Sequence, residues 1–204
     1  MKDTLRLLMP LALAICFIQC HHSAKDIPEA PAKRPAVINA NPSGTYMTPA
    51  ESMKTMYLPE GYHLQLVASE PMIQEPVSIA WDGNGRMYVA EMRSYMKDAD
   101  ATGENVASSK ILRLEDTNGD GIMDKSTVFI DSLLMPRMIL PLDNGELLVN
   151  ETYSTEFYCY TDSNGDGKAD EKIKQPHASA FLNMQVEHGT SGLVWNIDNW
   201  IYTT

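Results

Sequence analysis

A nine-residue motif of the form D-x-N-G-D-G-x-x-D occurs twice in the chain, at residues 116–124 and 162–170. The two copies begin 46 residues apart, and each follows an apolar segment. A motif that returns together with its flanking segments predicts a chain built from a repeated structural unit.

Each copy of the motif has oxygen-bearing side chains at positions 1, 3, 5 and 9, and a glycine at position 6 that permits a sharp turn. This pattern suits Ca²⁺, a hard cation that takes six to eight oxygen ligands. Position 12, where an EF-hand carries glutamate, is Thr127 or Ile173, and the flanking segments have the character of strands. The motif therefore predicts calcium loops between strands, with a pair of metal-free polar turns as the alternative. The predicted ligands, including the residue at position 7, are Asp116, Asn118, Asp120, Ile122 and Asp124, and then Asp162, Asn164, Asp166, Lys168 and Asp170.

Around the motif the chain repeats a pair of strands joined by a tight Gly/Asn turn. A third strand then leads into each Asp-rich loop, and a fourth strand follows the loop. Four antiparallel strands per unit, repeated in tandem, are typical of a β-propeller blade. We therefore predict an all-β fold, a β-propeller of four-stranded blades, of which this chain covers about two and part of a third. The predicted strands are 77–82, 86–90, 111–115 and 127–130 in the first unit, 138–143, 146–150, 156–161 and 172–174 in the second, and 192–198 and 200–202 in the third.

The first part of the chain resembles an export signal. Residues 1–20 combine two early basic residues with an apolar run and end at Cys20. The run is too short for a comfortable membrane span and fits a signal peptide, and a Cys in this place resembles the lipidation site of bacterial lipoproteins. We expect an exported protein held to a membrane by a lipid on Cys20, with ordinary cleavage nearby as the alternative.

The folded domain is predicted to begin after a tether. Residues 21–47 are polar and Pro-rich without periodicity, which indicates an extended linker. The domain then covers residues 48–204, opening with a short helix near 49–56 that Thr48 caps, followed by a strand at 61–68.

Charge and cysteine content exclude several functions. The formal net charge is −11 and no Lys/Arg cluster is present, which argues against nucleic acid as a partner. Cys16, Cys20 and His21 form C-x-x-x-C-H, which is one residue longer than the haem attachment motif, so no haem is expected in this chain. Cys159 lies in an apolar run and is expected to be a buried, inert thiol.

Strand order separates two edges of each predicted unit. The tight turns and the Asp-rich loops share one edge, where calcium would be structural. The opposite edge lies toward the mouth of the central channel, and His188 there is the candidate general base. Glu91 and Tyr95, each taken alone, are interpreted as solvated loop residues. The charged and aromatic residues predicted at this edge are Glu91, Arg93, Tyr95, Arg137, Glu187 and His188.

His188 also begins a stretch that resembles a known family. The sequence H-G-T-S-G-L, with Asp198 and Tyr202 beyond it, is similar to H-x-G-G-x-L…D…Y of the soluble quinoprotein glucose and sorbosone dehydrogenases. Thr190 and Ser191 depart from that pattern. More broadly, L-V-A-S-E-P at 66–71, V-A-E-M-R-S-Y at 89–95 and L-E-D-T-N-G-D-G at 114–121 resemble the propeller module of the membrane-bound dehydrogenases of Planctomycetes, Verrucomicrobia and Bacteroidetes.

This resemblance implies a six-bladed ring and a function. His188 would take the proton of a sugar or alcohol hydroxyl while hydride passes to pyrroloquinoline quinone. Arg93 and Arg137 would bind anionic groups of quinone or substrate, and a c-type cytochrome domain would follow downstream. The alternative is a calcium-stabilised lipoprotein propeller that binds a glycan or a protein without redox activity.

Overall fold

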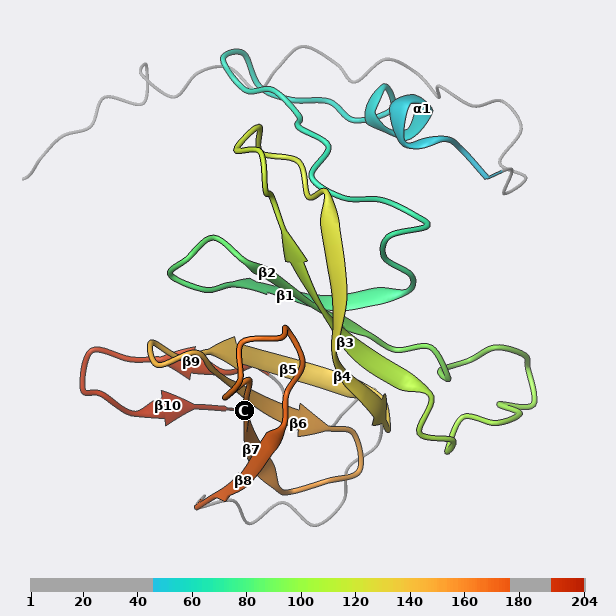
Figure 1. Cartoon of the computed structure of the whole chain (residues 1–204). Coiled ribbons are helices and arrows are strands. Elements are labelled where there is room, and N and C mark those ends of the chain that lie inside the picture. The colour runs from blue at the N-terminus through green and yellow to red at the C-terminus, as the bar shows by residue number, and fades with distance from the viewer. Residues whose placement is uncertain (1–45, 177–191, 204) are drawn as a thin grey trace, which may run out of the picture. The chain divides into compact units, whose positions relative to one another are not determined.

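The computed structural model describes residues 46–176 and 192–203, in two units divided after Tyr62 (Figure 1). The predicted signal peptide, Cys20, nearly all of the linker, Glu187 and His188 lie outside the described residues. In the described ranges no helix is long and apolar enough to cross a membrane.

The first unit contains the predicted helix, α1 (Pro49–Met53). The Thr48 side chain accepts a hydrogen bond from the backbone N–H of Glu51, and the Glu51 carboxylate accepts one from the N–H of Thr48 at 2.8 Å. This capping box confirms the predicted start. The helix ends three residues earlier than predicted, because Lys54 and Thr55 donate to carbonyls three residues back, which is the tighter 3₁₀ pattern.

The second unit is built from antiparallel sheets (Figure 1), which confirms the predicted all-β character. Two four-stranded sheets have the same strand order, β1-β2-β3-β4 and β5-β6-β7-β8, and a two-stranded hairpin follows them. The first sheet consists of β1 (Pro76–Trp81), β2 (Met87–Glu91), β3 (Ser109–Glu115) and β4 (Lys125–Leu133). The second consists of β5 (Pro136–Pro141), β6 (Glu146–Glu151), β7 (Phe157–Thr161) and β8 (Glu171–Gln175), and the hairpin of β9 (Val194–Trp195) and β10 (Ile201–Tyr202).

The repeated sheets and the hairpin match in backbone detail as well as in strand order. Gly85, Gly145 and Asn199 occupy the same place in the three hairpin turns, and their φ angles are 80°, 84° and 68°. A left-handed residue suits the twist of tight hairpins, and Gly or Asn adopts it at low cost. The pairing of β1 with β2 and of β5 with β6 is also interrupted at the same place, after Pro76 and after Pro136.

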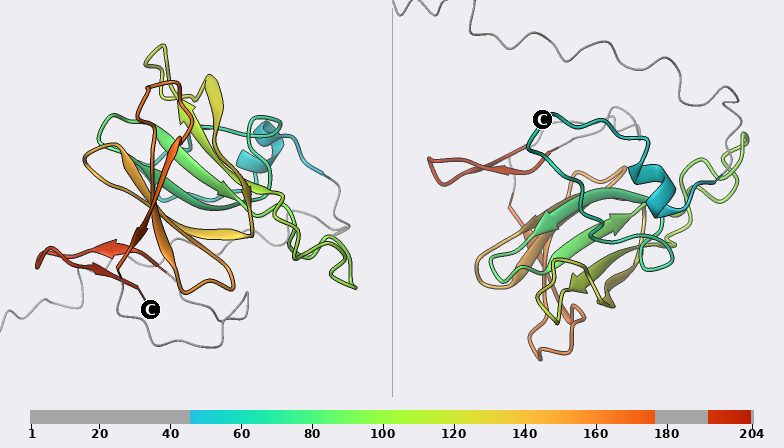
Figure 2. Two further views of the ribbon diagram at one scale, coloured as in Figure 1. Left: turned by 60° about the horizontal axis from the view of Figure 1, so that its bottom comes forward. Right: turned by 90° about the horizontal axis from the view of Figure 1, so that it is seen from above.

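The sheets stack face to face, and each contributes both faces to a core (Figure 2). One core lies between the first and second sheets, and a second lies between the second sheet and the β9–β10 hairpin. Every residue of β2 is buried, because the outer face of the first sheet packs on the chain at 67–73. The core shared by the two sheets includes Tyr88, Ile111 and Phe129 from the first and Ile139, Leu147, Val149 and Tyr160 from the second.

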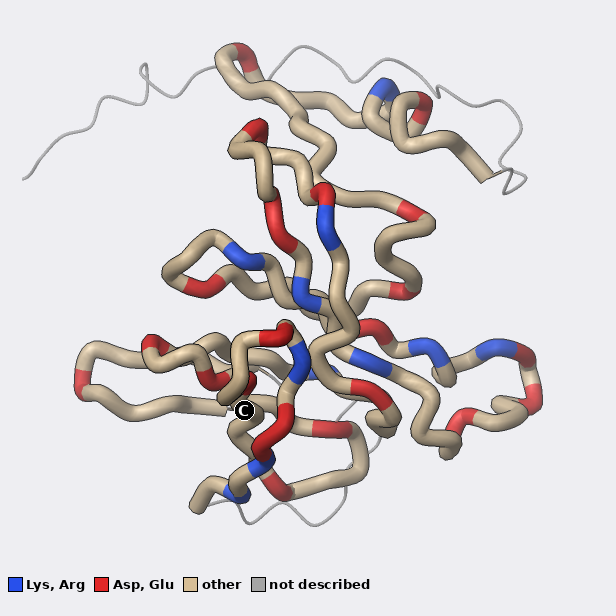
Figure 3. Tube along the Cα trace, viewed as in Figure 1, with Lys and Arg blue, Asp and Glu red and all other residues tan. Residues whose placement is uncertain are grey.

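Two segments outside the sheets are the chain before β1 and the loop between β2 and β3. The strand predicted at 61–68 is wrong: the described backbone bonds of the segment run from Tyr62 N–H to the Pro59 carbonyl and from Met123 N–H to the Val67 carbonyl, and they make no ladder. The chain between β2 and β3 forms a long, largely exposed loop that carries charges of both signs (Figure 3).

Candidate functional site

The antiparallel order gives each four-stranded sheet two distinct edges. The hairpin turn between the first and second strands and the Asp-rich loop between the third and fourth strands lie at one edge, which we call the Asp-loop edge. The starts of β1 and β5 and the ends of β2 and β6 lie at the other, which we call the opposite edge. This arrangement confirms the separation of edges that the sequence predicted.

The two Asp-rich loops have matching hydrogen bonds. In the first loop the Asp116 carboxylate accepts the backbone N–H groups of Gly119 and Gly121, both at 2.7 Å. In the second, Asp162 accepts the equivalent N–H groups at 2.7 and 2.8 Å. The carboxylate at position 9 closes each loop by accepting the hydroxyl at position 2, from Thr117 in the first loop at 2.8 Å and from Ser163 in the second at 2.9 Å.

The backbone N–H groups favour the charged form of the first carboxylate of each loop, Asp116 and Asp162. The Gly121 N–H, more than any other group, lowers the pKa of Asp116 below its usual value. Burial raises the pKa of Asp162, but the N–H groups of Gly167 and Gly165 and the Arg113 guanidinium outweigh it, so that this pKa is also lowered. Within the described residues no three His, Cys, Asp or Glu side chains converge as a metal site. Calcium binding by the two loops stays a prediction.

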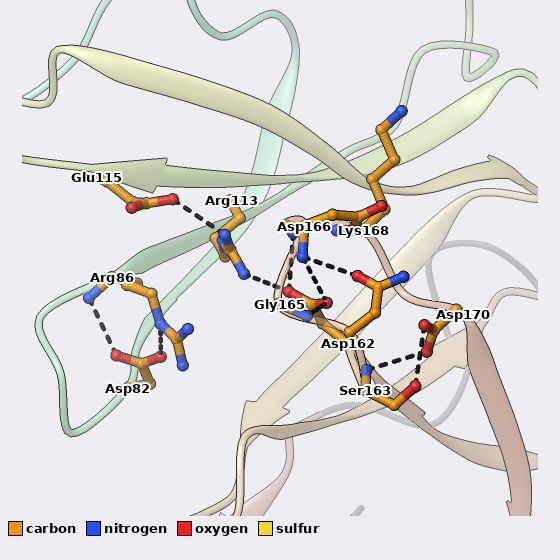
Figure 4. A network of polar contacts seen from close by, with 12 residues as sticks. Asp82, Arg86, Arg113, Glu115, Asp162, Ser163, Gly165, Asp166, Lys168 and Asp170 are labelled. Carbon is orange, nitrogen blue, oxygen red and sulfur yellow. Dashed lines mark hydrogen bonds and ion pairs between the residues drawn. The ribbon is translucent and has the colours of Figure 1, made fainter.

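The two loops differ in what contacts them, and Figure 4 shows the contacts of the second loop. Arg113, on β3, donates from Nη1 to Asp162 Oδ2 at 3.0 Å and from Nη2 to Glu115 Oε1 at 3.1 Å, and its side chain is 8% exposed. In the first loop the neighbour is uncharged, since Gln65 Nε2 donates to the Asp120 carbonyl at 3.2 Å. The second loop therefore already has a buried cation on its first carboxylate. The sequence carries no signal for Arg113, which is 49 residues from Asp162.

At the opposite edge the structure overturns the interpretation of Glu91 as a solvated loop residue. Its side chain is fully buried, because the chain that enters β1 packs over the end of β2. Glu91 Oε1 accepts the Gln74 N–H at 2.7 Å, and Oε2 pairs with Arg93 Nε at 2.7 Å.

Glu151 repeats this contact in the second sheet, where its Oε2 accepts the Leu134 N–H at 2.6 Å. In both sheets the donor stands 17 residues before the carboxylate. The pair therefore forms a repeated clamp that fastens the entry to the first strand onto the end of the second. Aligning V-A-E at 89–91 with V-N-E at 149–151 would have found Glu151 from the sequence.

The two predicted arginines lie at this edge in corresponding sheets. Arg93 follows β2 and is part-exposed. Two hydrogen bonds hold it: its Nε donates to Glu91, and its backbone N–H donates to Ser109 Oγ at 3.0 Å. Arg137 is half-buried at the start of β5. Tyr95 is also half-buried. The predicted base, His188, lies outside the described residues.

An apolar cavity of about 460 Å³ lies between the second sheet and the third hairpin, and Leu148, Phe157 and Trp200 line it. Cys159 also faces this cavity and is 3% exposed. Burial raises the pKa of the Cys159 thiol to about 11, so that the thiolate is scarce at neutral pH. The prediction that this thiol is buried is confirmed.

The fold and its edges define an all-β protein made of repeated, antiparallel four-stranded sheets. A family model described as "Domain of unknown function (DUF7133)" matches residues 48–204, and the chain belongs to this family. No curated protein and no solved structure matches the chain.

Proposed function

We propose that the chain is the propeller portion of an exported quinoprotein-type dehydrogenase that oxidises a hydroxyl of a sugar or related alcohol. The observation that carries the proposal is the Arg93 guanidinium, which a fully buried carboxylate holds at the opposite edge. Arg137 stands at the same edge of the next sheet, and His188 precedes the third hairpin in the sequence. In this proposal the sheets are successive blades, and the opposite edge faces the mouth of the channel.

Each of these residues has a role in the proposal. His188 accepts the proton of the substrate hydroxyl as general base. Arg93 and Arg137 bind anionic groups of substrate or quinone, because a planar guanidinium forms paired hydrogen bonds with carboxylates. The bond from Arg93 Nε to Glu91 fixes the plane of that guanidinium. Pyrroloquinoline quinone, when bound, would supply the hydride acceptor.

Calcium has a structural role in this proposal. Asp116, Asn118, Asp120, Asp124 and the Ile122 carbonyl would hold it in the first loop, and the equivalent residues would do so in the second. The first loop fits a cation better, because the Arg113 guanidinium already neutralises part of the charge on Asp162. Calcium there would tie the third strand of a sheet to the fourth.

The proposal extends to location and electron transfer. A lipid on Cys20 would anchor the protein to a membrane outside the cytoplasm, with residues 21–47 as the tether. A c-type cytochrome domain would take the electrons. These elements rest on the signal-like sequence of residues 1–20 and on the family resemblance.

One observation favours a second candidate, a lipoprotein propeller that binds a glycan or a protein without redox chemistry. The Glu91 carboxylate is used by the fold, and Glu151 repeats its clamp in a sheet where the residue two positions later is Tyr153 and not arginine. The carboxylates at the opposite edge therefore have a structural role that does not depend on catalysis.

Reduction of a dye by the complete gene product, reconstituted with quinone and calcium and offered a panel of aldoses and alcohols, tests the first candidate. We expect reduction that His188→Ala abolishes and His63→Ala preserves, because His63 is exposed and belongs to neither edge. Full activity in His188→Ala, or no reduction with any substrate, would contradict the proposal. Saturable binding on a glycan array without quinone uptake would support the second candidate.

A further inference from the structure

The segment before the first sheet contacts the first Asp-rich loop as β4 contacts the second. Met123 and Ala169 hold the same position in the two loops, 46 residues apart. The Met123 N–H donates to the Val67 carbonyl at 2.9 Å, and the Ala169 N–H donates to the Phe129 carbonyl at 2.8 Å. Val67 therefore stands where Phe129 stands in the next repeat.

A second contact gives the same register. A Cβ at Gly121 would overlap the Gln65 side chain, and a Cβ at the equivalent Gly167 would approach the Thr127 methyl group at 3.2 Å. Gln65 lies two residues before Val67, just as Thr127 lies two residues before Phe129. Two separate contacts thus align the segment with β4.

Because β4 is an edge strand of its four-stranded sheet, we infer that residues 64–68 form the equivalent edge strand, the fourth, of a further sheet. The other three strands of that sheet come from a further repeat of the same polypeptide. Within the described residues the segment forms no ladder. The strand predicted there from sequence is then formed only when the other three strands dock.

An exposed apolar stripe on β1 marks where the rest of this sheet lies. Ile139 on β5 is 6% exposed because the first sheet covers it, whereas its equivalent Ile79, 60 residues earlier on β1, is 50% exposed. Trp81, two residues further along β1, lies on the same side and is 52% exposed, and Val77, next to the interrupted pairing, is 49% exposed. The first sheet therefore presents the face that a preceding sheet covers in the next repeat.

The packing of the second sheet on the first indicates which strands would cover the exposed face of β1. β5 contacts β1, β2 and β3 of the sheet before it, so β1 is expected to contact the first three strands of the missing sheet. The third of these strands would pair antiparallel with residues 64–68, as β3 pairs with β4. The docking would close the ring through a sheet shared by distant parts of the chain. The inference rests on the ring arrangement in the proposed function, but not on its chemistry.

Hydrogen exchange on the complete gene product tests the pairing. We expect the amides of residues 64–68 to exchange as slowly as those of β4, because a ladder would protect them. Exchange as fast as in the charged loop at 97–106 would overturn the inference. Protection that disappears on dilution, together with a halved mass in ultracentrifugation, would assign the strands to a second copy and would also overturn it.

A substitution on the β1 face tests the docking separately from dye reduction. Ile79→Asp in the complete gene product is expected to lower the melting temperature by several degrees, since the charge would be buried under the docked sheet. Val106→Asp is the matched control, because Val106 is 57% exposed in the charged loop. An Ile79→Asp protein that melts with the Val106→Asp control would show that nothing covers this face.

Discussion

Arg113 shows how one buried side chain makes two repeats of the same loop unequal. Its guanidinium lies between Asp162 and Glu115, and removal of either carboxylate would leave part of a buried charge without its partner. The first loop has no such dependence, because Gln65 is neutral and contacts a backbone carbonyl. Equivalent aspartates are therefore expected to differ in their effect on stability.

Asp162→Asn is expected to lower the free energy of unfolding by about 2 kcal/mol more than Asp116→Asn, because only Asp162 pairs with a buried cation. Both variants keep a side-chain oxygen that can accept the loop N–H groups. Urea unfolding in the presence of a chelator, so that metal binding does not contribute, measures the difference. Equal losses in the two variants would show that Arg113 gains nothing from Asp162.

A glycine pair in the second loop tests the close approach of Arg113. Gly165→Ala and Gly167→Ala both place a side chain at a left-handed residue, at a cost of about 1–2 kcal/mol. Only the Gly167 Cβ would also meet a neighbour, Arg113 Nη2, at 2.7 Å. Gly167→Ala is therefore expected to be the more destabilising in thermal unfolding, and equal melting temperatures would contradict this geometry.

The lowered pKa values of Asp116 and Asp162 predict the response of the loops to acid. A carboxyl whose pKa is lower in the folded state stabilises the fold above its unfolded pKa, and this stabilisation is lost as pH falls through the folded pKa. Stability should therefore be constant above about pH 5 and fall below about pH 4. Urea midpoints between pH 2.5 and 7 measure it, and Asp116→Asn with Asp162→Asn together should reduce the slope below pH 4.

At the scale of elements, the repeated clamp explains why strand entry is the same in both sheets. Glu91 and Glu151 each accept the N–H of a residue 17 positions earlier, just before the first strand. The bond joins the start of the first strand to the end of the second, where the pairing of the two strands is interrupted. The clamp thus compensates for an irregular ladder.

Glu151→Ala is expected to lower the free energy of unfolding by about 1–3 kcal/mol, because the Leu134 N–H loses its acceptor. Glu151→Gln should retain most of the stability, since the amide oxygen can still accept the bond. Chemical unfolding of the two variants measures the contrast. A Gln variant as unstable as the Ala variant would mean that the negative charge, and not the hydrogen bond, matters.

At the scale of the whole molecule, packing on both sides explains why the central strands of the two four-stranded sheets, β2, β3, β6 and β7, lack a solvated face. Val89 on β2 packs on the chain at 67–73, and Val149 on β6 packs in the core between the two sheets, so these equivalent residues are equally buried. Calcium, if bound, would act on this stack from its Asp-loop edge. Its effect would be on stability and not on the opposite edge.

Removal of calcium is expected to lower the melting temperature, because a ligand that binds only the folded state stabilises it. We expect Asp116→Asn to remove more of this effect than Asp162→Asn, since Arg113 competes with the metal at Asp162. Thermal unfolding with calcium and with excess EDTA measures both. A melting temperature that EDTA leaves unchanged in the parent protein would identify the loops as ordinary polar turns.

The sequence by itself determined the repeat, the hairpin turns and the separation of the two edges. These features are local: Gly85 and Gly145 specify left-handed turns, and Asp116 and its neighbours close a loop within nine residues. The order of antiparallel strands then follows from short connections. Little tertiary information is needed for any of these steps.

Only the tertiary structure decided the burial of Glu91, the pairing of Arg113 with Asp162 and the unpaired state of residues 64–68. Each depends on groups that are distant in the chain, 17 residues apart for Glu91 and Gln74 and 49 for Arg113 and Asp162. A single sequence has no period that reports such contacts, because they arise when separate elements pack. The same reason leaves residues 64–68 extended: a strand needs a partner, and its partner is expected from elsewhere in the fold.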